Sequence, residues 1–170
     1  LLGGLIFNFY AWICALVLVH IMGFSMCMMR LSHVRAARAV GTAYAELFRN
    51  TPEYILLTWI HFVLPLLLSA FLQTRLNFPP FLSAVLALGL AYSGYMVETY
   101  RSGIQAVPKG HIEAGRALGM SGFDITLRIV LPQAIRNVLP EMLNQMVSLF
   151  KATTLVSLIA VPDLLYNVVI

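Results

Sequence analysis

Long uncharged stretches alternate with short charged ones along this chain of 170 residues. Residues 5–29, 54–72 and 81–97 contain no Lys, Arg, Asp or Glu, and a fourth apolar run over 142–161 has Lys151 as its single charge. As a helix, the first run extends about 37 Å, which exceeds the thickness of a hydrocarbon core, about 30 Å. The pattern therefore predicts four membrane-spanning helices.

Proline and glycine residues modify this pattern. Pro65 lies inside the second run, where we expect a kink, because neighbouring groups must compensate in lipid for the donor that proline lacks. Gly89 and Gly94 lie in the third run, where small residues let two helices approach closely. Pro162-Asp163 begins another apolar run. We expect one transmembrane domain over residues 1–170, cut from a longer protein with about five spans.

The composition agrees with a membrane protein. Hydrophobic residues make up 60% of the chain and charged residues only 11%, whereas soluble domains carry roughly 25% charged residues. The net charge of +4 does not indicate a nucleic-acid partner, because the basic residues lie between apolar runs. Cys14 and Cys27 share one predicted helix, so they indicate neither a disulfide framework nor a metal site.

The basic residues predict an orientation. Of the eleven Lys and Arg residues, four lie in 30–49 and five in 101–136, while the turn at 73–80 has only Arg75. Cytoplasmic loops of membrane proteins carry an excess of Lys and Arg. We therefore expect both basic segments in the cytoplasm and the amino terminus outside.

The second basic segment contains a loop, residues 108–132, with the signals of a short isolated helix. Pro108 breaks the preceding helix, residues 112–118 can form two helical turns, and Gly119 suits a helix end. Ser121 and Asp124 have the spacing of a capping box for a second helix. Because so short a helix is not stable alone in water, we expect it to bind a partner surface.

This loop resembles the EAA loop of binding-protein-dependent ABC importer permeases. The resemblance rests on the order and spacing of Glu113, Ala114, Gly115, Gly119, Ile129, Leu131 and Pro132. Gly115 replaces the second alanine of that motif. Glycine costs about 1 kcal/mol of helix propensity relative to alanine, so we expect a looser helix here.

Three further segments resemble the polar amino-acid branch of that family, whose members handle solutes such as histidine, glutamine and glutamate. They are residues 46–52, 100–110 and 151–155, although Ala152 stands where an acidic residue is usual. The resemblance covers nearly the whole chain. It implies an all-α, polytopic transmembrane helix bundle of the type I ABC importer permease kind in a bacterial cytoplasmic membrane.

The resemblance also implies the mechanism and the partners. The short helix docks on a cytoplasmic ABC ATPase dimer, and a second permease subunit, identical or homologous, completes the pore. An extracytoplasmic solute-binding protein delivers the solute. We expect no cofactor in this chain, since ATP is used by the partner and no phosphate-binding loop is present. The implied coupling residues are Glu113, Ala114, Gly115, Ala117, Leu118 and Gly119.

Polar residues in or beside the spans are candidates for the translocation path. They are Glu98, Asn144, Lys151, Thr153 and Thr154. Each has an alternative interpretation: Glu98 could pair with Arg101 one helical turn away, Lys151 could extend to the membrane surface, and the amide and hydroxyl groups could bond between helices.

His20 and His61 also lie within spans, and we interpret both as packing or interhelical bonding residues rather than metal ligands. Two other functions stay open at this point. The chain could belong to an ion-coupled secondary transporter or channel, with Lys151 and Glu98 as coupling residues, or to a membrane receptor that transports nothing. No constellation of residues indicates catalysis by this chain.

Overall fold

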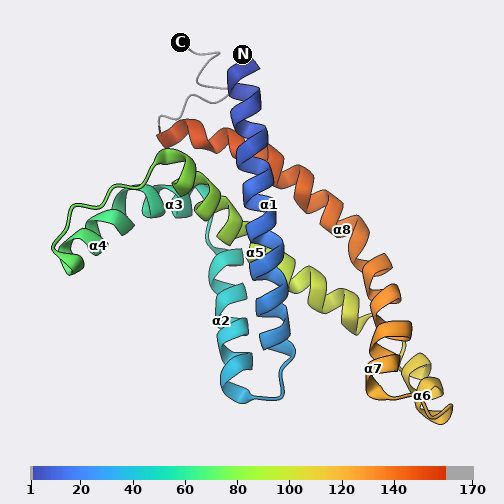
Figure 1. The fold of residues 1–170 in the computed structure, drawn as a ribbon. Coiled ribbons are helices and arrows are strands. Elements are labelled where there is room, and N and C mark those ends of the chain that lie inside the picture. The colour runs from blue at the N-terminus through green and yellow to red at the C-terminus, as the bar shows by residue number, and fades with distance from the viewer. Residues whose placement is uncertain (1, 160–170) are drawn as a thin grey trace.

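The computed structural model describes residues 2–159, which fold into an all-helical arrangement (Figure 1). This confirms the expected fold class. Residues 160–170 lie outside the described residues, and with them the Pro162-Asp163 start of a further run.

The first predicted span is helix α1, Leu2–Leu31. The chain then reverses into α2, Arg35–Asn50, which runs back along α1 (Figure 1). Gly41 permits this contact, because a Cβ there would lie 2.7 Å from both the backbone nitrogen of Arg30 and the carbonyl oxygen of Met26. Most of the first basic segment, residues 30–49, therefore forms helix α2.

The second predicted span is divided into α3 (Glu53–Thr58), the π-helical turn η1 (Trp59–Val63) and α4 (Leu64–Leu72). In η1 the N–H of Leu64 donates to the carbonyl of Trp59, five residues earlier. A proline at position 65 clashes with the carbonyl four residues before it in a regular α-helix. The wider turn absorbs that conflict where the sequence predicted a kink.

Helix α5, Pro80–Gln105, is the centre of the core. It packs against α1, α2 and α8. Both predicted close approaches are confirmed: a Cβ on Gly89 would lie 2.5 Å from Leu18 of α1, and one on Gly94 would lie 2.8 Å from the backbone nitrogen of Arg49 in α2.

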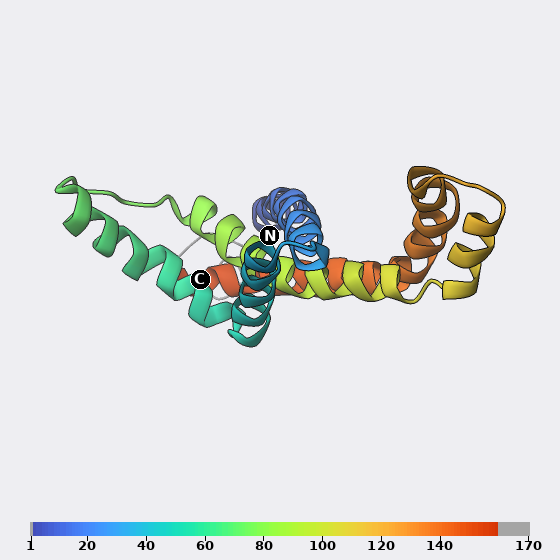
Figure 2. The same ribbon diagram turned by 90° about the horizontal axis from the view of Figure 1, so that it is seen from below.

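The rest of the described chain forms α6 (Lys109–Ala117), α7 (Gly122–Ile125), the π-helical turn η2 (Thr126–Val130), α8 (Leu131–Ala152) and the 3-10 helix η3 (Thr153–Ile159). Seen from below, α6 and α7 form one end of the molecule and α4 the other (Figure 2).

Within residues 2–159, three helical stretches are long and apolar enough to cross a membrane: Gly4–Leu31, Glu53–Leu72 and Pro80–Gln105. The fourth predicted span differs from expectation, because its helix begins at Leu131 rather than at 142 and becomes a 3-10 helix at Thr153. Helix α8 is 22 residues long but carries Asn137, Glu141 and Gln145, which make it less apolar than the other three.

Candidate functional site

The loop over 108–132 folds as a short helix between two defined ends. Pro108 precedes α6, so the helix begins at Lys109, earlier than the predicted residue 112. It ends at Ala117, and Gly119 just beyond it has a φ of +74°, the left-handed conformation that glycine adopts most easily. The N–H of Met120 donates to the carbonyl of Gly115 at 3.0 Å, which closes the last turn.

The second half of the loop returns the chain to the membrane. The hydroxyl of Ser121 accepts a hydrogen bond from the N–H of Asp124 at 3.1 Å and donates to the Asp124 carboxylate at 2.6 Å. The predicted cap is thus confirmed, with the carboxylate bonded to the hydroxyl rather than to the backbone. Asp124 also pairs with Arg128 at 3.4 Å.

Gly115 is the buried residue of α6. A Cβ at this position would lie 2.9 Å from Cδ1 of Ile129 and 3.1 Å from Cγ1 of Ile125. The glycine therefore allows α6 to lie directly on α7 and η2. His111 and Gln133 connect the same helix to α8 through a 2.9 Å hydrogen bond.

The other predicted coupling residues point away from the protein. Glu113, Ala114, Ala117, Leu118 and Gly119 are all exposed. Leu118 is 82% exposed, and Phe123 of α7 beside this helix is 74% exposed. Large apolar side chains this open to water are typical of a binding surface.

A polar cavity of about 340 Å³ lies between α3, α5 and α8. Its lining residues are Glu53, Tyr92, Tyr95, Glu141, Asn144, Gln145 and Ser148. None of them is basic, and neither glutamate forms an ion pair within the described residues. Gln145 donates to Glu141 at 3.1 Å, and its own Oε1 is buried without a protein partner. The cavity offers two carboxylates and an unsatisfied acceptor to a ligand that can donate hydrogen bonds.

The structure places one of the five predicted path residues, Asn144, in this cavity. Lys151 is exposed near the end of α8. Thr153 is buried and donates to the carbonyl of Phe150 at 2.7 Å, and Thr154 donates to that of Lys151 at 2.8 Å. These hydroxyls complete the end of the helix rather than line the cavity.

Glu98, the fifth predicted path residue, is the centre of an ion-pair cluster. It contacts Arg30 of α1, pairs with Arg49 of α2 at 3.6 Å and pairs with Arg101 on its own helix at 2.8 Å. Glu46 joins the cluster at 3.3 Å from Arg49. The predicted pairing of Glu98 with Arg101 is confirmed, and the two other arginines connect three helices through one carboxylate.

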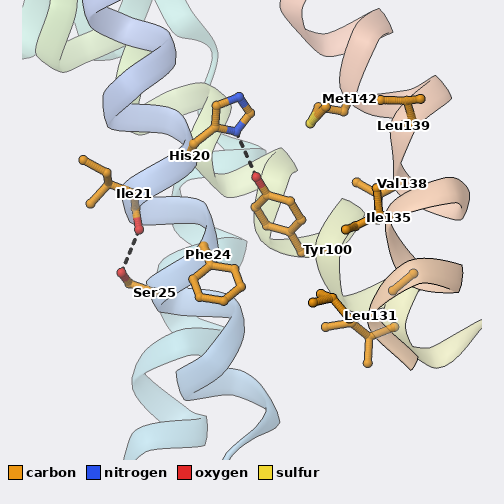
Figure 3. A pocket seen from close by; sticks show the side chains of 12 residues that line it. His20, Ile21, Phe24, Ser25, Tyr100, Leu131, Ile135, Val138, Leu139 and Met142 are labelled. Atoms are coloured by element: carbon orange, nitrogen blue, oxygen red, sulfur yellow. Dashed lines mark hydrogen bonds between the residues drawn. The ribbon is translucent and has the colours of Figure 1, made fainter. Parts of the chain in front are cut away.

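A larger cavity, about 680 Å³, lies between α1, α5 and α8 and is almost wholly apolar (Figure 3). His20 and Tyr100 point toward each other at its edge and share a hydrogen bond of 2.9 Å (Figure 3). His61 bonds similarly to Ser83 at 3.0 Å. Both histidines therefore bond between helices, as predicted. A polar solute would lose its hydrogen bonds to water in the apolar cavity, so the smaller polar one suits it better.

A match to a protein family covers most of the chain and decides which family it belongs to. Residues 21–169 match the family described as "Binding-protein-dependent transport system inner membrane component". The chain belongs to this family. It is a permease component of an ABC importer, a multi-pass inner-membrane protein that works with a binding protein and a separate ATPase subunit. This confirms the resemblance found at the EAA loop.

Individual relatives agree. The chain is 32% identical over 168 residues to the glutamate/aspartate import permease of Escherichia coli O6:H1, covering 96% of this chain and 73% of that protein. It is 39% identical over 137 residues to the arginine ABC transporter permease of Haemophilus influenzae, covering 79% and 62%. A crystal structure of an amino acid ABC transporter with histidines superposes with a TM-score of 0.86 and 32% identity, over 98% of this chain and 74% of the other.

The sequence did not predict the polar cavity that contains Glu53 and Glu141. The sequence singles out Asn144 as a polar residue in an apolar run, but Glu53 and Glu141 lie at the borders of such runs. The sequence shows that Glu53 and Glu141 are polar. It does not show that they face the same cavity, because that depends on how α3 and α8 cross α5.

Proposed function

We propose that this permease imports polar amino acids and that the polar cavity between α3, α5 and α8 lies on their path. The observation that carries the proposal is the pair of carboxylates, Glu53 and Glu141, facing a cavity without basic residues. Every amino acid carries an ammonium group that two carboxylates attract. The named substrates of the relatives, arginine and glutamate or aspartate, share this group. Lys151, Thr153 and Thr154 stay predictions for the path.

The cavity is also well placed for transport. Tyr92 and Tyr95 lie midway along α5, Glu141 lies at the middle of α8, and Ser148 lies in its second half. One permease chain lines only one side of such a path. A second permease subunit, identical or homologous, supplies the opposite wall.

Coupling to the ATPase is assigned to α6. Its exposed residues Glu113 and Leu118, with Phe123 beside them, form the surface offered to the partner, and the packing of Gly115 fixes α6 against the segment that leads into α8. A movement of α6 is thereby transmitted to the helix that lines the cavity. The same arrangement supports an amino terminus outside, because the start of α1 and the α6 end lie on opposite sides of the molecule (Figure 1).

The transport proposal is tested by uptake of radiolabelled amino acids into proteoliposomes that contain the complete transporter. With binding protein outside and ATP inside, we expect accumulation of a polar amino acid, and none without ATP. Accumulation driven by an ion gradient alone would favour the secondary-transporter alternative and overturn the proposal.

The coupling assignment has its own test. Glu113→Lys places a cation on the exposed docking surface, so we expect the ATPase to dissociate during purification or to lose its stimulation by the binding protein. Arg75→Glu, an equal charge reversal in the distant turn after α4, is the control. Normal co-purification and stimulation of Glu113→Lys would contradict the docking role of α6.

A further inference from the structure

The outward face of α2 carries a shallow groove of about 470 Å³ that the transport function does not use. The groove is lined by Arg35, Arg38, Ala39, Thr42 and Ala43. Spacings of three and four residues place these side chains on one face of the helix. Ala39, Thr42 and Ala43 have small side chains, so they leave the groove open beside the two arginines.

The positive charge of this face is not neutralised within residues 2–159. Arg35 and Arg38 form no ion pair there, since Glu46 and Glu98 pair with other arginines. Arg38 is also held in place, because its guanidinium donates to the carbonyl of Ser32 at 3.3 Å. A fixed and unpaired arginine is suited to bind an anion.

The groove lies at the charged end of a membrane span. The uncharged run of α1 ends at Arg30, and Gly41 of α2 packs against the backbone of that residue. The face from Arg35 to Ala43 therefore lies beside the point where α1 leaves the hydrocarbon core. Lipid phosphates are found at this depth.

We propose that this face of α2 binds an anionic phospholipid, with Arg35 and Arg38 on the headgroup phosphate. Thr42 adds a hydroxyl donor to the same site. The bound lipid would neutralise the arginines and hold the α1–α2 pair at the membrane surface. The proposal does not depend on which solute is transported.

The test measures binding of fluorescent phosphatidylglycerol to the complete detergent-purified transporter. Near a membrane surface each arginine contributes about fivefold in affinity, so the double variant Arg35→Gln/Arg38→Gln should bind about 25-fold more weakly. Arg35→Lys/Arg38→Lys keeps the charge and should retain most of the binding, and Arg75→Gln should bind like the unaltered protein. If the double variant does not fold, Arg35→Gln alone should lose about fivefold.

Four results would overturn the proposal. Equal binding by the double glutamine variant would remove the arginines from the site. Equal binding of phosphatidylcholine, whose zwitterionic headgroup has no net charge, or competition by millimolar inorganic phosphate, would show that the site does not select an anionic lipid. Loss of the ATPase from the double variant with unchanged lipid binding would assign this face to an acidic protein surface instead.

Discussion

Two regions of the molecule use glutamate in opposite ways. Glu98 is surrounded by arginines from α1, α2 and α5, and its charge is used up in joining those helices. Glu53 and Glu141 face a cavity that no basic side chain lines, and their charge is left available. Both kinds of carboxylate lie at the borders of apolar runs, so residue type alone does not separate a structural glutamate from a ligand-binding one. The neighbouring helices decide it.

The largest expected effect comes from removing the structural carboxylate. Glu98→Ala leaves three arginines without their common partner in a partly buried site, which should cost about 3 kcal/mol of folding free energy. A marked drop in the melting temperature of the detergent-purified transporter is the measurement. If the variant melted normally but lost amino-acid uptake, Glu98 would belong to the path rather than to the scaffold.

A change at Glu141, a carboxylate of the polar cavity, should impair uptake and leave the stability of the protein unchanged. Glu141→Gln keeps the shape of the side chain and an oxygen acceptor for Gln145, so we expect an unchanged melting temperature. Loss of a charged hydrogen bond to the ammonium group should cost about 2 kcal/mol. Uptake assays should then show a KM raised by roughly thirtyfold. An unaltered KM would remove Glu141 from the solute site.

A smaller effect is expected from a peripheral member of the ion-pair cluster. Arg49→Gln leaves Glu98 with two arginines, and the Arg49 side chain is about one third exposed at 35%. Such pairs contribute less than about 1 kcal/mol. The melting temperature should fall by only a few degrees and uptake should be normal. A loss as large as that of Glu98→Ala would mean that the cluster depends on all of its members.

Features that depend on neighbouring residues were predictable from the sequence. The span over α1, the turn at 73–80, the glycine contacts at Gly89 and Gly94, and the Ser121 cap all follow from local composition and spacing. The short helix of the loop over 108–132 was predictable for the same reason, because its signals lie within one short segment.

Features that depend on several helices were not predictable in the same way. Glu53 and Glu141 meet only because α3 and α8 both pack on α5. The two π-helical turns were also missed, although each directly precedes a Leu-Pro pair, Leu64-Pro65 and Leu131-Pro132. The sequence predicted a kink at the first proline. A third Leu-Pro pair, Leu139-Pro140, lies inside α8 without such a turn, so the pair alone does not predict a π-helical turn.

The most direct test of the path uses a cysteine at Asn144, in a transporter whose native cysteines, Cys14 and Cys27, are replaced by alanine. The rate of labelling by a water-soluble thiol reagent is measured in the reconstituted complex with and without amino acid and ATP. We predict that the transported amino acid protects the cysteine and that ATP changes its accessibility. A labelling rate that responds to neither would contradict the assignment of the polar cavity to the translocation path.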